Sequence, residues 1–326
     1  MLKRKIYPVL ITLIVLVFTL SGCERKEDLY ITSADLYFDT VVNIKIWGTT
    51  DESLLEGCAD ICEKYENLFS RTINTSDISK LNNADGKAVT LDSETIELLR
   101  YSVELSKLSD GVFDITTAPL SDLWKVKDNP GIIPDIKDIE DALSHVDYRN
   151  IYFEGDNKAG LTDESAQVDL GALAKGYVAD RLKDYLVSNE VKRAIIDLGG
   201  NIVVIGEKND GSPYNIGIQK PFDDRNEVLL SVPVKDKSVV SSGTYERYFE
   251  KDGHIYHHIF DSKTGFPVDN DLNGVTIISD SSLLGDALST TCFILGKEQG
   301  MELLKQYPDV KALFIDKEMN VTKVNE

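Results

Sequence analysis

Short apolar runs joined by tight turns fill the second half of the chain. Ala194–Leu198 and Ile202–Ile205 are two such runs, and Gly199-Gly200-Asn201 between them is typical of a β-hairpin. Turns this short join antiparallel neighbours, because a parallel pair needs a long crossover. Further runs of strand length follow at about 215–219, 228–234, 238–241, 255–260 and 274–279, with a last hairpin over 312–324. The pattern predicts a largely antiparallel sheet.

Segments with helical periodicity are interspersed among these runs. Helices are expected at about 51–69, 93–109, 172–188 and 282–295. In the first half of the chain, the sequence predicts one long strand over 35–47, which contains Phe38-Asp39-Thr40, and a short strand over 112–116. There is no internal repeat and no clear linker. We therefore expect one α+β domain over 31–326, with largely antiparallel sheets and packed helices rather than a doubly wound parallel sheet.

The N-terminus has the features of an export signal. Lys3, Arg4 and Lys5 precede an apolar run, Val9–Leu20, that is too short to span a bilayer comfortably. The run ends in Leu20-Ser21-Gly22-Cys23, which resembles the bacterial lipobox. An ordinary signal peptide or a buried apolar helix are the alternatives. The order of the features favours a signal peptide over 1–22 and a tether over 23–30 lipidated at Cys23, which anchors an exported protein to the outer face of the cell membrane.

The charge of the chain argues against two classes of partner. Its formal net charge is −20 at pH 7, and removal of the basic residues at the N-terminus makes the rest more negative. Such a chain repels nucleic acid and anionic lipid head groups. We therefore expect no nucleic-acid partner, and attachment to a membrane only through the lipid anchor.

Three cysteines remain once Cys23 is lipidated. Cys58 and Cys62 lie four residues apart in the apolar stripe of the first helix, and Cys292 lies in the last predicted helix. An odd count argues against a disulfide framework, and no further ligands near Cys58 and Cys62 suggest a zinc site. They are predicted to be small residues of the core.

Asp286 and Thr290 are candidates for a metal site. They stand four residues apart on a predicted helix, so their oxygens lie on one face with Cβ atoms roughly 6 Å apart. A carboxylate and a hydroxyl suit a hard cation such as Mg²⁺, which keeps open positions for phosphate oxygens. The Thr264-Gly265 turn just upstream allows backbone amides to approach an anion. By itself the pair is also common on a solvated helix face. Other segments of the chain have to distinguish a metal site from that alternative.

Several other segments have the composition of a site. Asp110–Thr116 places two carboxylates and a glycine around a short strand, and Ser241–Arg247 is a polar, glycine-centred turn. Asp169–Tyr177 runs through small residues into a helix, whose N-terminus is a natural anion site to which Lys175 adds a positive charge. In the predicted strand over 255–260, His258 and Phe260 would share one face while Ile259 and Asp261 point the other way.

Taken together, the set resembles the ApbE family of FAD:protein FMN transferases. The matching pieces are, in order, FDT from Phe38, SDGVFDIT, VDLGALAKGYVAD, DLGGN, IGIQKPF, SSGTYERYF, HHIFDSKTGFP and GDALST. They run from about Tyr37 to the end of the helix over 282–295, which is most of the chain. An ApbE-like fold, related to the T-fold, is expected from this resemblance.

The resemblance also implies a reaction and a set of residues. The family uses Mg²⁺ and FAD, and moves FMN onto a Thr or Ser hydroxyl of a target protein with release of AMP. Asp286 and Thr290 match its metal ligands, together with a backbone carbonyl near Ala172. His258 matches a histidine proposed to assist the transfer, although Asp261 is a second candidate for the base. The residues that fall at or beside the family's FAD-contact positions are Phe38, Val112, Phe113, Asp114, Lys175 and Ile259.

Three activities fit these residues. The first is FMN transfer to an exported or membrane acceptor protein that carries a Thr/Ser flavinylation motif; the chain contains no copy of that motif, so the acceptor is another protein. The second is a Mg²⁺-dependent FAD pyrophosphatase, in which water replaces the hydroxyl and FMN and AMP are released. The third is a flavin-binding lipoprotein without chemistry, which would not need Asp286, Thr290 and His258 together.

Overall fold

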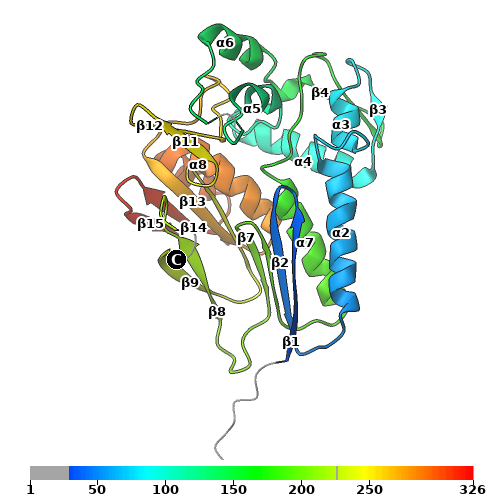
Figure 1. The fold of residues 1–326 in the computed structure, drawn as a ribbon, viewed down its shortest axis with the longest axis vertical. Helices are drawn as coiled ribbons and strands as arrows, with labels where there is room; N and C mark the ends of the chain where they lie inside the picture. Colours follow the sequence, from blue (N-terminus) through cyan, green and yellow to red (C-terminus); the bar gives the residue numbers. More distant parts are fainter. Residues whose placement is uncertain (1–28, 129, 225–226, 326) are drawn as a thin grey trace, which may run out of the picture.

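A computed structural model describes residues 29–128, 130–224 and 227–325. The predicted signal peptide and Cys23 lie outside these residues. An eight-stranded sheet forms the centre, in the order β1-β2-β6-β7-β10-β13-β14-β15, and every neighbouring pair is antiparallel, as predicted (Figure 1). Its strands are β1 Tyr30–Tyr37, β2 Thr40–Trp47, β6 Ala194–Leu198, β7 Asn201–Ile205, β10 Ser238–Gly243, β13 Leu272–Ser279, β14 Lys311–Asp316 and β15 Val321–Val324.

The N-terminal part of the sheet is a hairpin, and the prediction of one strand over 35–47 is wrong. The chain reverses between β1 and β2 at Phe38 and Asp39, whose φ angles are 53° and 58°. No glycine marks this turn, and the apolar alternation continues through it. Glu66 stabilises the turn from α2, because its Oε1 accepts the Phe38 N–H at 2.7 Å. Left-handed backbone at two non-glycine residues is uncommon and has to be held by such contacts.

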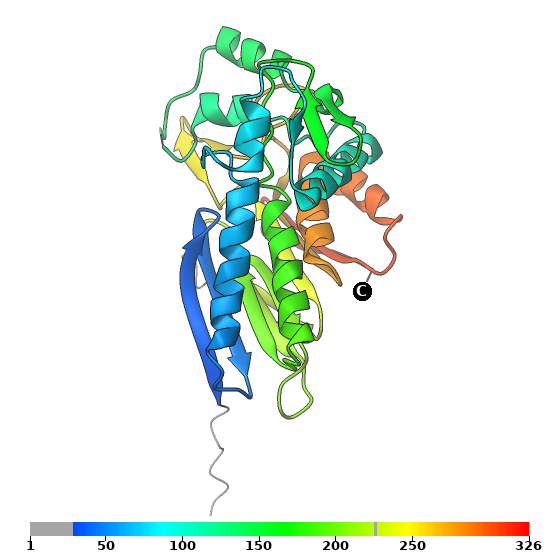
Figure 2. The ribbon, with the colours of Figure 1, turned by 90° about the vertical axis from the view of Figure 1, so that its right-hand side faces the viewer.

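Long helices cover one face of the sheet. They are α2 Ser53–Phe69, α7 Ala174–Ser188 and α8 Ser282–Leu304, and the predicted helices are confirmed (Figure 2). Helix α8 is interrupted at Gly296, where φ is 77°, which is the predicted end of its first part. The largest core cluster lies between α2, α7 and strands β2 and β6, and a second lies between α8 and strands β13 and β14.

A smaller hairpin covers the opposite face of the sheet. It consists of β8 Tyr214–Gln219 and β9 Val228–Val234, which pair antiparallel. Ile216, Ile218 and Val232 from this hairpin are buried in one cluster with Val204 and Leu313 of the central sheet. The main sheet is therefore buried on both faces at its centre.

Shorter elements gather at the end of the sheet where β1 turns into β2 (Figure 1). One of them, α5 over Ala118–Trp124, has a proline in its first turn and was not predicted, although proline is favoured there. The others are α3 Asp77–Asn82, α4 Ser93–Leu108, α6 Ile136–Ser144, the 3₁₀ helix η1 Tyr148–Asn150, and strands β3 Val89–Thr90, β4 Ile151–Glu154, β5 Lys158–Leu161, β11 Tyr248–Lys251 and β12 His254–His257.

Two further strand predictions are wrong. Residues 112–116 form a turn, because the Asp114 carboxylate accepts the Thr116 N–H at 2.7 Å and the Tyr148 N–H at 2.8 Å. The strand predicted over 255–260 ends at His257, whose Nδ1 accepts the Ile259 N–H at 3.2 Å. In both places a side chain satisfies the N–H group that a neighbouring strand would need.

All three cysteines of the described residues are free and buried, as predicted. Cys58 and Cys62 lie in the cluster beneath α2, and Cys292 lies in the cluster beneath α8. Within the described part of the chain, no helix combines the length and apolarity needed to cross a membrane.

Candidate active site

The candidate site is built around the crossing of α7 and α8. At the crossing, a Cβ atom on Gly176 would lie 2.5 Å from the Ser282 carbonyl oxygen and 2.8 Å from the Asp286 Cβ. Only glycine allows two helices to approach so closely. The contact presses the second turn of α8 against the first turn of α7. Asp286 is thereby placed at the N-terminus of α7.

Asp286 is a buried carboxylate held by donors from α7. Its side chain is only 4% exposed; Oδ2 accepts the Gly176 N–H at 2.9 Å, and Oδ1 lies 3.8 Å from the Lys175 Nζ. Burial raises the pKa of Asp286, while Lys175, the Gly176 N–H and the Asn201 amide oppose that rise. A carboxylate this buried has a strong electrostatic need for a cation.

Asn201 adds an unsatisfied polar group next to Asp286. It begins β7, it is 1% exposed, and its side chain is close enough to lower the pKa of Asp286. Among the described residues its Nδ2 makes no hydrogen bond of normal geometry, and only a weak interaction with the Asp286 carboxylate remains. Buried amides without partners are rare in proteins, and they indicate a place where a ligand or water completes the structure.

Thr290 follows Asp286 by one helical turn on α8, as predicted. It is half-buried, and its Oγ1 lies 3.1 Å from the Ser242 Oγ at the end of β10. The Ser242 Oγ also lies 2.8 Å from the Ser289 Oγ. The hydroxyl of Thr290 is thus fixed by the central sheet as well as by its own helix.

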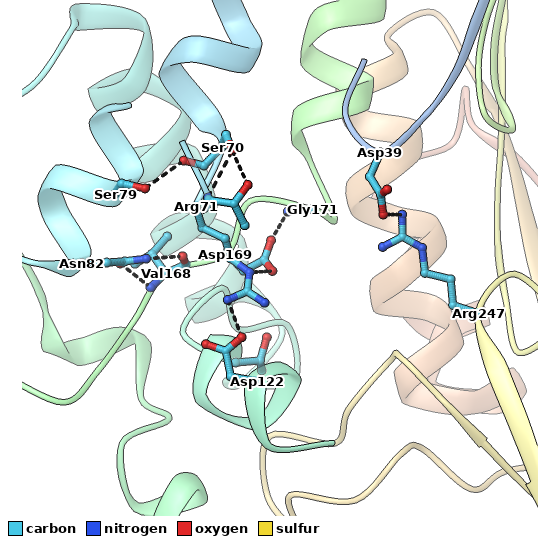
Figure 3. A network of polar contacts seen from close by, with 12 residues as sticks. Asp39, Ser70, Arg71, Ser79, Asn82, Asp122, Val168, Asp169, Gly171 and Arg247 are labelled. Carbon is cyan, nitrogen blue, oxygen red and sulfur yellow. Dashed lines mark hydrogen bonds and ion pairs between the residues drawn. The ribbon is translucent and has the colours of Figure 1, made fainter. Parts of the chain in front are cut away.

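Ala172 lies in the turn that leads into α7. Asp169 shapes this turn, because its Oδ1 accepts the Gly171 N–H at 2.7 Å. Its Oδ2 lies 3.0 Å from the Nε of Arg71, which also donates to Asp122 at 2.8 Å, so that three segments meet here (Figure 3). The network holds the half-buried Ala172 immediately before the helix N-terminus that faces Asp286.

His258 follows β12 and is half-buried. The Arg247 carbonyl oxygen accepts the His258 N–H at 3.2 Å and lies 3.3 Å from His258 Nδ1. A carbonyl can only accept, so Nδ1 carries the proton and Nε2 keeps its lone pair. Burial and the positive charges of Arg247 and Lys175 lower the pKa of His258 to about 3. His258 is therefore neutral near pH 7 and has one nitrogen ready to accept a proton.

Arg247 connects His258 to the turn between β1 and β2. Its Nη2 lies 3.0 Å from the Asp39 Oδ2 (Figure 3). The Lys127 Nζ lies 2.7 Å from the same carboxylate. Phe38, a predicted FAD contact, precedes Asp39 in the turn and is half-buried. The ion pairs bring the turn to Arg247, whose carbonyl fixes His258, although all three charged side chains are largely exposed.

The predicted contacts around residue 113 occupy a second loop. Val112 is half-buried, and Phe113 is buried in the largest core cluster. The Asp114 carboxylate accepts two backbone N–H groups, and burial raises its pKa. Ser262 donates to the Gly111 carbonyl at 2.7 Å, so this loop contacts the loop that follows His258.

Two residues of the predicted set have clear structural roles. Ile259 is 8% exposed and belongs to the core cluster beneath α8. The Asp261 carboxylate accepts the Lys263 N–H at 2.8 Å, and its main chain closes a turn with Thr264 and Gly265. The proposed role of Asp261 as base stays a prediction, with His258 the better placed of the two.

The structure thus brings Asp286 and Lys175 together where α7 begins, with Thr290 one turn further along α8 and Ala172 two residues before the start of α7. His258 is close enough to Lys175 for that charge to lower its pKa. Sequence reasoning missed the individual roles of Asn201 and Ser242, although both lie in segments that matched the family, DLGGN and SSGTYERYF. The signal was a polar residue directly next to a glycine, at the first residue of β7 for Asn201 and near the last residue of β10 for Ser242.

The residues fit a hard divalent cation. Among the described residues, no three His, Cys, Asp or Glu side chains cluster to hold a metal by themselves. Asp286 is nevertheless a buried carboxylate whose nearest cation is 3.8 Å away, with a hydroxyl oxygen one turn along the helix. One acid with neutral oxygens is the donor set of a Mg²⁺ site that keeps positions for phosphate oxygens. A transition metal would call for histidine or cysteine ligands.

Comparison with known proteins agrees with this geometry. The family model described as the ApbE family matches residues 38–314, so the chain belongs to the ApbE family. A protein from Klebsiella pneumoniae (strain 342) named FAD:protein FMN transferase is 36% identical over 273 residues, which cover 83% of this chain and 84% of that protein. A protein of the same name from Treponema pallidum is 33% identical over 301 residues, covering 86% and 83%. The relatives are transferases, and this chain is an enzyme of that class.

Solved structures of the family share the fold. The ApbE protein of Thermotoga maritima superimposes with a TM-score of 0.82 and 29% identity, covering 90% of this chain and 97% of that one. The flavin transferase ApbE from Vibrio cholerae gives a TM-score of 0.80 with 25% identity, covering 91% and 97%. The predicted ApbE-like α+β fold is confirmed.

Proposed function

We propose that this protein is a Mg²⁺-dependent FAD:protein FMN transferase. It would move FMN from FAD to a Thr or Ser hydroxyl of another protein and release AMP. The observation that carries the proposal is the buried Asp286 carboxylate, which has Thr290 one turn away and faces the N-terminus of α7. Membership of the ApbE family and the names of the relatives support the same activity.

Asp286, Thr290 and the Ala172 carbonyl would hold the cation. Mg²⁺ bound there would neutralise charge that develops on the pyrophosphate of FAD. Lys175 would add a positive charge beside the same oxygens, and the N-terminus of α7 favours anions. The predicted FAD contacts Phe38, Val112, Phe113, Asp114 and Ile259 lie in the loops described above, and their roles stay predictions.

His258 would accept the proton of the incoming hydroxyl at Nε2. A bond would form between the acceptor oxygen and the FMN phosphorus, while the bond from that phosphorus to the bridging oxygen breaks and AMP leaves. With a pKa of about 3, His258 is a weak base in the ligand-free protein. The negative pyrophosphate offsets Lys175 and Arg247, so we expect FAD to raise that pKa towards the working pH.

A transfer assay tests the proposal. The domain that starts after Cys23 is mixed with FAD, Mg²⁺ and a protein carrying the family's acceptor motif, and the acceptor is followed by intact-mass spectrometry. We expect the acceptor to gain one FMN. Asp286→Ala should lower the rate by about 100-fold or more, because a metal contributes several kcal/mol. His258→Ala should lower it by about 10²-fold or more. Glu298→Ala, an exposed acid on the same helix, is the matched control.

The same assay separates the alternatives. Free FMN and AMP with an unmodified acceptor would identify a pyrophosphatase, in which water takes the place of the hydroxyl. Unchanged FAD that binds equally to wild type and Asp286→Ala would leave a flavin-binding protein. Chromatography of the free flavin distinguishes these two results.

We further propose that the protein is exported and anchored by lipid at Cys23 to the outer face of the bacterial membrane. The order of basic residues, apolar run, small residues and Cys23 supports this. The acceptor would then be an exported or membrane protein. Labelled palmitate should enter wild type and be absent from Cys23→Ala, which should leave the membrane fraction; incorporation into the variant would contradict the proposal.

A further inference from the structure

Three hydroxyl groups from β10 and α8 form a chain that ends on a backbone carbonyl. The Ser289 Oγ lies 3.1 Å from the Asp286 carbonyl oxygen. The Ser242 Oγ lies 2.8 Å from the Ser289 Oγ and 3.1 Å from the Thr290 Oγ1. Ser289 is fully buried, while Ser242 and Thr290 are half-buried at the edge of the candidate site.

The direction of each hydrogen bond in this chain follows from counting protons. A hydroxyl has one proton to donate and two lone pairs, whereas a carbonyl can only accept. Ser289 therefore gives its proton to the Asp286 carbonyl, and Ser242 must donate to Ser289. With the Ser242 proton used, Thr290 has to donate to Ser242. Neither lone pair of the Thr290 hydroxyl is then used by Ser242 or Ser289.

The neighbouring residue shows what Thr290 would do without Ser242. A threonine inside a helix commonly donates to the carbonyl four residues earlier. Thr291 does so, because its Oγ1 donates to the Ala287 carbonyl at 2.7 Å. The corresponding acceptor for Thr290 is the Asp286 carbonyl, whose two lone pairs are already used by the helical N–H of Thr290 and the hydroxyl of Ser289. Ser289 thus blocks the ordinary bond, and Ser242 draws the Thr290 hydroxyl towards the sheet.

We propose that Ser242 is a positioning residue that fixes the hydroxyl rotamer of Thr290 for metal binding. The inference rests on the proposed function, in which Thr290 and Asp286 hold the cation. Removing the Ser242 hydroxyl leaves the Thr290 proton without its acceptor, so that Thr290 has to turn or to place that proton towards the cation. Loss of a residue that orients a metal ligand typically weakens metal affinity 10- to 100-fold.

Ser241 provides a matched control on the same strand. It is the preceding residue of β10 and is also half-buried, and its Oγ lies 2.8 Å from the Thr276 Oγ1. Ser241→Ala therefore removes a hydroxyl and a hydrogen bond of the same kind without touching Thr290. A difference between the two variants reports on Thr290 rather than on general loss of a strand hydroxyl.

The test is the affinity for Mn²⁺. The full chain, purified in detergent and freed of metal, is titrated with Mn²⁺ in the presence of one equivalent of FAD, and free Mn²⁺ is followed by electron paramagnetic resonance. We expect Ser242→Ala to raise the dissociation constant about 10-fold or more and Ser241→Ala to change it less than about twofold. Ser289→Ala, which frees the competing carbonyl, should also weaken binding, and it carries the test if Ser242→Ala does not fold. Thermal unfolding without metal checks folding.

The outcomes distinguish a failure of the proposed role of Ser242 from a failure of the proposed metal site. If Ser242→Ala and Ser289→Ala bind Mn²⁺ as tightly as wild type while Asp286→Ala does not, the role of Ser242 is wrong and the metal site stands. Equal losses in Ser242→Ala and Ser241→Ala would also overturn that role. If wild type binds Mn²⁺ no better than Asp286→Ala, both the inference and the proposed metal site are wrong.

Discussion

At the scale of single residues, His257 should make the stability of the protein depend on pH. It is 1% exposed, it donates from Nε2 to the Val268 carbonyl at 2.9 Å, and burial lowers its pKa to about 4. The unfolded chain takes up a proton below about pH 6.5, while folded His257 does not until about pH 4. Its contribution is therefore complete above pH 6.5 and is lost as the pH falls towards 4, by about 3 kcal/mol.

Chemical denaturation at pH 6.5 and pH 4.5 checks this. The free energy of unfolding should fall less between these pH values in His257→Asn than in wild type. His254, on the same strand and exposed, supplies the control variant His254→Asn, which should follow wild type. An equal fall in all three proteins would show that His257 does not contribute.

Single residues also show which parts of the candidate site can be predicted from the sequence. Helical spacing was enough to bring Asp286 and Thr290 together, because four residues on a helix fix their relative positions. Asp114 and Asp261 look equally functional in the sequence, yet both carboxylates accept N–H groups two residues further along the chain. A carboxylate that caps its own turn and one that faces a ligand differ only in tertiary surroundings.

At the scale of elements, the crossing of α7 and α8 depends on Gly176. We expect Gly176→Ala to cost about 1–3 kcal/mol in the free energy of unfolding, because the new Cβ would meet the backbone of α8. It should also weaken metal binding, since it displaces the turn that carries Asp286. Denaturation and Mn²⁺ titration measure the two effects.

Gly57 on α2 gives the matched substitution. A Cβ there would meet the tip of the Tyr185 side chain, which can move, rather than backbone. Gly57→Ala should therefore be tolerated, helped by the higher helix propensity of alanine. If both variants lost the same stability, close approach of the backbones would not explain Gly176.

Elements were predicted well where periodicity was sustained and poorly where the chain turns. The helices over α2, α4 and α7 and the hairpin of β6 and β7 were found, since apolar spacing and a Gly-Gly-Asn turn define them. The turn at Phe38 and Asp39 was missed, because it has no glycine and is held by Glu66 from α2. Local sequence patterns do not reveal a contact between distant segments such as that of Glu66 with Phe38.

At the scale of the whole molecule, the buried cysteines report whether the two core clusters open together. Burial raises the pKa of Cys58, Cys62 and Cys292 to about 12 each, and only the thiolate reacts. In the domain that starts after Cys23, we expect no reaction with a thiol reagent in the native state. All three should become reactive at the same guanidinium concentration, because one continuous sheet joins the clusters. Reaction of Cys292 alone at lower denaturant would show that the α8 cluster opens first.

The hairpin of β1 and β2 is a rigid arm that sets the distance between its base and its turn. The first described residues lie at its base, and at its turn Asp39 pairs with Arg247, whose carbonyl fixes His258. At about 3.3 Å per residue, the eight residues of β1 separate the base from the turn by about 25 Å. With the chain tethered at Cys23 as proposed, an upright arm would lift the chemistry at least that far above the lipid, because the tether over 23–30 adds to the length of β1. The hydroxyls within reach would then be those that protrude from the bilayer, so the arm and the tether together would select among acceptors.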